Sequence, residues 1–331
     1  MHGAPGEAPA ALSWGAAPFT VCETLPAPTE PPYPPLTLAD RVLSLDGYPD
    51  PFEAYRDLGL QTKQAVLGLL PPHWSFAGKR VMDFGSGAGR TLRHFLDEAE
   101  AAEFWAVDVD APSIAWLRQH LSPPLKTARC GPAPPLNFDD GYFDLVWAIS
   151  VFTHLTDTSL PWLLELHRVL KPGGLLIATY MGRWNSEVLA NEPWDEDRIG
   201  MNVLRHNNPW DTGGPMVLMS DWWVRSHWGR AFEILEIEPR VHNQSWALLR
   251  RRDVQPTVED LERPADDSRE YDALRHNLRQ VQRELDLSVQ RLAEYENSLS
   301  WKVTRPLRAL RRRLRASRRA TDSTTSSSRP P

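Results

Sequence analysis

A glycine-rich turn follows a short apolar stretch and supplies the first chemistry in the chain. Residues 80–84 are typical of a buried strand that contains one acid, Asp83. The turn then places Gly85, Gly87 and Gly89 at alternate positions. A strand that leads into such a turn and then into a helix is a nucleotide-binding arrangement, and glycine lets the backbone approach a ligand closely.

The spacing of these glycines argues against a dinucleotide ligand. Dinucleotide folds use G-x-G-x-x-G, whereas this turn reads G-x-G-x-G behind an acidic strand residue. Asp108 ends the next predicted strand about 20 to 25 residues later, where a carboxylate can hold two ribose hydroxyls. Asp110 is the second choice for that role, although an Asp after a strand is often only a helix cap.

Four segments together resemble class I S-adenosylmethionine (SAM)-dependent methyltransferases. They are residues 83–90 (DFGSGAGR), 107–110 (VDVD), 140–146 (DGYFDLV) and 166–174 (LHRVLKPGG). The resemblance implies an enzyme of EC 2.1.1 type over residues 38–253, with SAM as cofactor. It also implies an α/β fold: a Rossmann-like, seven-stranded, mostly parallel sheet with helices on both faces and an antiparallel last strand. Asp83, Gly85, Gly87, Gly89 and Asp108 are the SAM-binding residues that it implies.

One segment departs from the pattern of these methyltransferases. Relatives carry an Asp or Asn after the third strand for the adenine amino group, but this stretch reads Cys130-Gly131-Pro132. Either the backbone of Gly131 replaces that contact or the affinity for SAM is reduced.

Transfer of a methyl group to an alcohol requires the protein mainly to position the acceptor and remove its proton. Ser150 and His154 follow the fourth predicted strand, at the rim where the resemblance places the sulfonium. We therefore assign Ser150 to SAM and His154 to the general base, with a packing or helix-capping histidine as the alternative. Tyr55 resembles the aromatic residue that many relatives fold over SAM, and its alternative is plain helix packing.

The rest of the chain alternates in the way that builds a parallel sheet. The patterns predict strands at 80–84, 104–108, 125–130, 143–149, 175–180, 231–238 and 241–250, and helices at 52–70, 89–98, 112–121 and 160–170. Residues 181–220 interrupt the alternation of strands and helices with aromatic and polar side chains, which indicates a substrate-facing insertion. Its candidate contacts, with Tyr180 before it, are Trp184, Trp194, Asp195 and His206, and Asp195 and His206 are the alternative bases.

The two ends of the chain differ in composition from the middle. Residues 1–37 are rich in Pro and Ala and predict a disordered leader, and residues 254–270 predict a linker. From 271 to 299 apolar residues alternate steps of three and four, with Ser288 as the polar exception. This heptad favours a homo-oligomeric coiled coil over a single helix lying on the domain.

Residues 300–331 hold ten Lys/Arg and one acid, which leaves −15 on the rest of a chain whose net charge is −6. Residues 301–316 form a basic amphipathic pattern that suits an anionic membrane surface, and a solvated tail is the alternative. The segment around Trp301 also resembles tails on bacterial enzymes of surface-polysaccharide biosynthesis, which implies O-methylation of a sugar on a cell-surface or lipid-linked glycan. A small molecule or RNA as acceptor, and a SAM-binding scaffold without activity, stay open.

Three further features of the sequence bear on the cellular location, on cysteine chemistry and on the class of acceptor. No secretory or membrane-spanning segment is visible, which predicts a cytoplasmic protein that the tail can hold at the inner membrane. Two cysteines make neither a disulfide framework nor a metal site. A nucleic acid is disfavoured as acceptor, because residues 148–152 lack the Asn-Pro-Pro-aromatic turn of adenine amino-methylation and neither cysteine suits cytosine chemistry.

Overall fold

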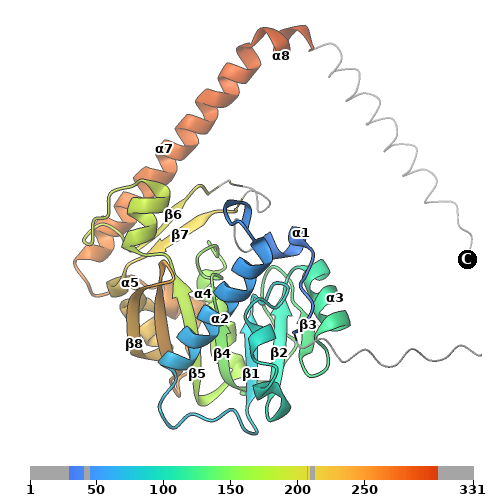
Figure 1. Ribbon diagram of the computed structural model, residues 1–331. Helices are drawn as coiled ribbons and strands as arrows, with labels where there is room; N and C mark the ends of the chain where they lie inside the picture. Colours follow the sequence, from blue (N-terminus) through green and yellow to red (C-terminus); the bar gives the residue numbers. More distant parts are fainter. Residues whose placement is uncertain (1–29, 41–44, 207, 209–212, 305–331) are drawn as a thin grey trace, which may run out of the picture.

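A seven-stranded sheet forms the centre of the computed structural model, which describes residues 30–40, 45–206, 208 and 213–304 (Figure 1). The strand order is β3-β2-β1-β4-β5-β9-β8, and only β9 runs antiparallel to its neighbours. The strands are β1 (Arg80–Phe84), β2 (Glu103–Asp108), β3 (Lys126–Arg129), β4 (Phe143–Ala148), β5 (Leu170–Tyr180), β8 (Phe232–Val241) and β9 (Gln244–Arg251). The predicted Rossmann-like fold and its antiparallel last strand are confirmed.

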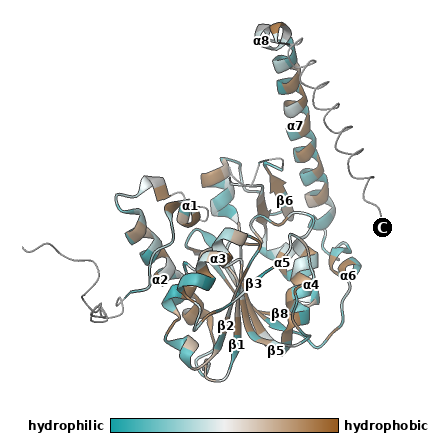
Figure 2. Ribbon diagram, turned by 90° about the vertical axis from the view of Figure 1, so that its right-hand side faces the viewer, coloured by the Kyte–Doolittle hydropathy of each residue, from teal (hydrophilic) through white to brown (hydrophobic). Residues whose placement is uncertain are grey.

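Helices cover both faces of this sheet, and the central strands β1, β4 and β5 are accordingly buried along most of their length (Figure 2). On one face α2 (Pro51–Leu69) and α3 (Ala111–His120) pack against side chains such as Val81 and Leu145. On the other face α4 (Ser159–Val169) and α5 (Asp221–His227) pack against their strand neighbours Met82 and Val146. Successive residues of a strand point to opposite faces, so one apolar run serves both layers.

The α-helix predicted at residues 89–98 is wrong. Two single 3₁₀ turns, η3 (Leu92–His94) and η4 (Glu98–Glu100), occupy this part of the chain. Leu92 and Phe95 are both fully buried, and side chains three residues apart align in a 3₁₀ turn. Their burial is compatible with either kind of helix, so the apolar pattern does not distinguish the two.

The predicted disordered leader ends earlier than residue 37. Tyr33 packs its ring against Phe52 with the centroids 5.3 Å apart, and the Arg93 guanidinium lies 4.0 Å from the Tyr33 ring centroid. Arg93 also donates a hydrogen bond of 2.6 Å to the carbonyl of Pro31. The helix α1 (Leu36–Ala39) and the turn η2 (Leu45–Gly47) follow. Residues 30–37 are thus part of the domain, and residues 1–29 lie outside the described part.

The insertion contains more regular structure than its sequence indicates. A π-helix, η5 (Asn185–Ala190), is followed by β6 (Met201–Leu204) and β7 (Met216–Met219), which form a separate antiparallel pair. The main chain of Met219 donates to the carbonyl of Met181, so the pair is attached at the end of β5. The turn η7 (Trp228–Arg230) ends this region.

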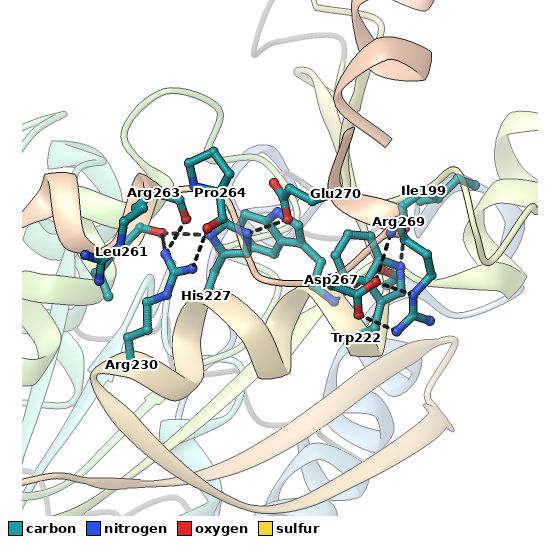
Figure 3. Close-up of polar contacts among 12 residues, drawn as sticks. Ile199, Trp222, His227, Arg230, Leu261, Arg263, Pro264, Asp267, Arg269 and Glu270 are labelled. Atoms are coloured by element: carbon teal, nitrogen blue, oxygen red, sulfur yellow. Dashed lines mark hydrogen bonds and ion pairs between the residues drawn. The ribbon is translucent and has the colours of Figure 1, made fainter. Parts of the chain in front are cut away.

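The predicted linker at residues 254–270 is docked on the domain. It contains α6 (Val258–Glu262), whose N-terminus is closed by reciprocal hydrogen bonds between Thr257 and Asp260. Leu261 is fully buried, and the Arg230 guanidinium donates to its carbonyl and to the carbonyls of Asp260, Arg263 and Pro264 (Figure 3). These backbone contacts hold the segment against η7, which composition alone does not reveal.

The heptad segment is a helix, α7 (Arg269–Asn297), followed by α8 (Leu299–Val303). The helix starts beside α5, where Glu270 contacts buried His227 at 3.1 Å (Figure 3), and then projects beyond the domain past β6 (Figures 1 and 2). Every residue from 285 to 297 is exposed. No helix in the described residues is long and apolar enough to cross a membrane. Residues 305–331, with most of the basic segment, lie outside the described part.

Candidate active site

A cavity of about 510 Å³ opens at the carboxyl ends of β1, β2 and β4. This is the edge of a parallel α/β sheet where ligands bind, and the volume is within the usual range for small-molecule sites. Five predicted site residues line it: Asp83, Gly85, Asp108, Gly131 and Ser150. The predicted base His154 lines it as well. Sequence reasoning missed other lining residues, notably Arg90, Val151, Leu155 and Trp162.

The three glycines of the turn have different roles. All three have left-handed backbones, with φ of +83° at Gly85, +52° at Gly87 and +79° at Gly89. A Cβ on Gly85 would lie 2.3 Å from Cγ2 of Val151 at the cavity wall. A Cβ on Gly89 would lie 2.5 Å from Leu117 of α3, so Gly89 permits packing of the turn on that helix and does not line the cavity.

The side chain of Asp108 is fixed by hydrogen bonds from the main chain, one of them from the glycine turn. Its carboxylate accepts hydrogen bonds of 2.7 Å from the main-chain N–H of Gly87 and of Asp110. Burial raises the pKa of Asp108, and these hydrogen bonds oppose the rise. Each oxygen retains a further lone pair for a ribose hydroxyl. Asp110, the second choice, instead caps α3 by accepting from the N–H of Ser113 at 3.0 Å.

Asp83 is the most perturbed acid of the cavity. It is 4% exposed, and burial, with the nearby carboxylate of Asp108, raises its pKa to about 7. The positive charge of Arg90 opposes this shift. A ligand ammonium beside Asp83 and hydroxyls beside Asp108 would offset the desolvation of both carboxylates. The residues present therefore fit SAM, which carries both kinds of group.

Cys130, Gly131 and Pro132, the segment where the sequence predicts the adenine contact, line the same cavity. Cys130 donates its main-chain N–H to the carbonyl of Asp108 at 3.0 Å, which ties the end of β3 to β2. Burial raises the pKa of the Cys130 thiol to about 11, so the thiol is protonated at neutral pH and is a poor nucleophile.

His154 is held in one tautomer at the opposite end of the cavity. Its Nδ1 lies 2.8 Å from the carbonyl of Pro215, and because a carbonyl only accepts, Nδ1 carries the hydrogen. Burial lowers the pKa of His154, although the Pro215 carbonyl acts in the other direction. The ring is thus neutral at pH 7, with its basic lone pair on Nε2.

Ser150 adopts a left-handed backbone with φ of +59°, which is uncommon for a residue other than glycine. Its N–H donates to Oγ1 of Thr179 at 2.7 Å, and its hydroxyl accepts from the side-chain amide of Gln244 at 2.9 Å. These contacts from β5 and β9 fix the turn that carries His154.

The remaining predicted residues do not line this cavity. Tyr55 is 1% exposed and belongs to a small apolar cluster with Ala39 and Leu45, which agrees with the packing alternative. Asp195 accepts from the N–H of Asp197 and pairs with Arg198, as expected of a turn residue. His206 donates its N–H to Glu284 of α7. Trp184 and Trp194 line a second cavity. Within the described residues no cluster of His, Cys, Asp and Glu could hold a metal.

Comparisons with known proteins agree with this geometry. Residues 82–178 match the family model described as a methyltransferase domain. The 2-methyl-6-phytyl-1,4-hydroquinone methyltransferase of Synechocystis sp. is 33% identical over 121 residues, 36% of this chain and 35% of that protein. Phthiotriol/phenolphthiotriol dimycocerosates methyltransferase 1 of Mycobacterium ulcerans is 30% identical over 129 residues, 39% of this chain and 45% of that protein. The chain therefore spans less than half the length of these relatives.

Among solved structures, a SAM-dependent methyltransferase from Mesorhizobium loti aligns with a TM-score of 0.46 and 16% identity, over 62% of this chain and 100% of that one. The family match covers the glycine turn and includes Gly85, Asp108 and His154, which line the first cavity. This chain therefore carries a class I SAM-dependent methyltransferase domain, with SAM as its cofactor.

Proposed function

We propose that the chain is a SAM-dependent O-methyltransferase in which His154 removes the proton of an alcohol acceptor. The observation that carries this proposal is the tautomer of His154, because a neutral ring with its lone pair on Nε2 is a proton acceptor at the SAM cavity. Burial favours the neutral form of this ring at physiological pH, which is the form that accepts a proton.

Different residues of the chain bind the cofactor and remove the proton of the acceptor. When bound, SAM would supply the methyl group, so the work of the chain's residues is to hold the two substrates and to remove the proton that the acceptor hydroxyl loses. Asp83 and Asp108 hold the ammonium and ribose ends, and the turn at Gly85 lets the backbone approach. His154 accepts the proton and, as an imidazolium, is hydrogen-bonded through Nδ1 to Pro215.

The proposed acceptor is a sugar of a cell-surface or lipid-linked glycan. Its support is the resemblance of the segment around Trp301 to tails of surface-polysaccharide enzymes. A phenol or hydroquinone is the second candidate, because relatives in Synechocystis and Arabidopsis are named for a hydroquinone and for tocopherol. The polysaccharide of cells with and without the gene should differ by the mass of one methyl group. Turnover with extracted quinone but not with glycan would favour the second candidate, and no turnover with either would favour a scaffold.

The proposed homo-oligomer forms through α7. The seam residues Tyr271, Leu278 and Leu292 are 71%, 69% and 56% exposed, an apolar stripe at heptad spacing that a second copy of the helix would cover. We expect Leu285→Lys to give a monomer by ultracentrifugation with unchanged affinity for SAM. Arg291→Lys, on the same exposed half of the helix, is the matched control. Attachment of residues 301–316 to an anionic membrane stays a proposal, because nearly all of that segment lies outside the described residues.

A further inference from the structure

A second cavity of about 280 Å³ adjoins the insertion. It is lined by residues 182–185 and Glu187 just after β5, by Trp194 and Glu196 of the insertion, by Asp221 at the start of α5, and by residues 243–245 at the turn between β8 and β9. Its volume is near the lower end of the range for small-molecule sites, about 300 Å³, which suits one ring better than an extended lipid.

One pair of hydrogen-bonded side chains joins this cavity to the SAM cavity. Gln244 lines the second cavity and donates its amide N–H to the hydroxyl of Ser150, which lines the first. Ser150 has a left-handed backbone with φ of +59°, and Gln244 directly follows the two-residue β8–β9 hairpin turn, in which His242 and Asn243 have φ of +47° and +65°. A left-handed backbone at a serine persists only where the surroundings enforce it, and such backbones concentrate at functional sites. An acceptor in the second cavity would therefore lie beside the end of the SAM cavity that holds His154.

The second cavity is lined by two indole side chains together with carboxylate, amide and hydroxyl groups. Trp194 donates its ring N–H to Glu196 at 2.7 Å, which fixes the ring, and Trp184 also lines the cavity. Asp221 accepts from the hydroxyl of Tyr180 at 2.6 Å and keeps further lone pairs for a ligand. Indole faces with carboxylate and amide acceptors are suited to a ring that carries several hydroxyl groups.

The charge of the lining restricts the ligand further. Glu187, Glu196 and Asp221 provide three carboxylates, whereas Arg183 is the one cationic side chain among the lining residues. Arg183 lies 3.9 Å from Glu187, so its charge is already partly balanced. A ligand carboxylate or phosphate would thus enter a field of like charge, while a neutral or protonated amino group would not.

We propose that this second cavity is the acceptor site and that it takes a neutral or amine-bearing sugar ring in preference to an anionic one. The proposal rests on the proposed function, since it places the acceptor of that same reaction. Gln244 and Ser150 position the acceptor hydroxyl at the boundary, and Trp184 and Trp194 stack on the ring. Substrate preference is then set by the insertion, outside the matched methyltransferase region.

The experiment titrates the full-length chain with three methyl glycosides, of glucose, glucosamine and glucuronic acid, by saturation-transfer NMR with and without S-adenosylhomocysteine. We expect the first two to bind and the glucuronide to bind at least tenfold more weakly. Trp184→Ala should weaken the first two at least tenfold, whereas Trp116→Ala, on α3 outside both cavities, should not. Asp221→Asn keeps a side-chain oxygen for Tyr180 but removes one charge, so it should narrow the discrimination against the glucuronide.

Equal binding of all three glycosides, binding of none, or indifference to both Trp184→Ala and Asp221→Asn would overturn the acceptor-site proposal. Thermal melts establish that each variant folds. A separate calorimetric titration with SAM keeps the two proposals apart. If SAM binds and no glycoside does, only the acceptor site fails, whereas glycoside binding without any SAM binding contradicts the proposed methyltransferase function.

Discussion

The first half of the domain, from β1 to β5, and the second half, which follows β5, form their cavities from different kinds of groups. From β1 to β5 the cavity is formed by strand ends and one turn, and its key groups are backbone N–H groups and two acids. After β5 the second cavity is formed by side chains from a π-helix, an insertion and a hairpin turn. Backbone geometry is dictated by a short motif, whereas converging side chains depend on the whole tertiary fold. On the proposed assignment of the second cavity to the acceptor, recognition of the cofactor and of the acceptor is separated along the chain.

The largest effect should come from the turn of the first half. In Gly85→Ala the new methyl group would meet Val151, a β-branched side chain with little rotamer freedom, in a left-handed backbone. Overpacking and strain together should destabilise the fold by about 3 kcal/mol and lower the affinity for SAM at least 100-fold. Urea unfolding and calorimetry measure the two effects.

Gly78→Ala is the matched control for this substitution. Gly78 also has a positive φ, +72°, but a Cβ there would meet nothing within 4 Å. We expect a loss of about 1 kcal/mol from strain alone and an unchanged affinity for SAM. Similar SAM affinities in the two variants would show that the turn does not shape the ligand site.

Substitution of His154 tests the boundary between the two halves of the domain. His154→Ala should lower turnover about 100-fold and leave SAM affinity unchanged, because the ring acts on the acceptor's proton. Burial lowers the pKa of this ring, so wild-type turnover should fall only on acidification below about pH 6.5, the ordinary value for histidine. The control is exposed His73→Ala, remote from both cavities. Near-normal turnover in His154→Ala would make this histidine structural.

Much of the first half could be predicted from the sequence for a physical reason. A strand buried on both faces must be a continuous apolar run, and a turn at a ligand needs glycine, so both leave local signals, as in residues 80–89. The sequence did not reveal that Gly89 faces Leu117, or that Tyr55 is buried away from the cavity. Those facts depend on which helix packs beside the turn, and no local pattern records that.

A smaller, pH-dependent effect should come from Asp83. Burial raises its pKa to about 7 from about 3.9 in an unfolded chain, so between these values the folded state binds more protons. The contribution of Asp83 to stability is therefore complete below about pH 4 and is lost as the pH rises through about 7. Thermal melts without ligand should show this loss, and Asp83→Asn should remove it.

SAM binding supplies an independent check on Asp83. A ligand ammonium favours the ionised carboxylate, so binding near pH 6.5 should release a proton. Calorimetry in two buffers of different ionisation heat measures that proton. If Asp83→Asn releases as many protons as the wild type, Asp83 does not face the ammonium and the assignment within the first half is wrong.

The second half was harder to predict because α7 carries two adjacent stripes of side chains, one apolar and one mainly polar. Its apolar seam is visible in the sequence, and next to it Glu270, Ala273, Asn277, Gln280 and Glu284 repeat at the same spacing. These residues lie against the domain: Glu270 contacts His227, Asn277 accepts from the N–H of Val203, and Gln280 bonds Asn202. Polar residues beside a heptad are normally read as solvated positions, so the docking stripe was missed. The apolar seam stays exposed while the docking stripe is occupied, which leaves the seam available to the proposed second copy of the helix.

The smallest effect should come from the last contact of this docking stripe. Glu284 accepts hydrogen bonds from the N–H of Arg205 at 3.0 Å and of His206 at 3.2 Å, just after β6. β6 is an edge strand of its small sheet, and side-chain acceptors from α7 satisfy N–H groups that a further strand would otherwise bind. Glu284→Ala should therefore destabilise the fold by only about 1 kcal/mol, since both contacts are near the surface. Hydrogen exchange should nevertheless become faster at Arg205 and His206, with SAM affinity unchanged. Glu294→Ala, on the exposed half of α7, should change neither quantity. Equal exchange rates at these two amides in both variants would mean that α7 is not held against the insertion in solution, and the insertion would then be shaped by β7 and α5 alone.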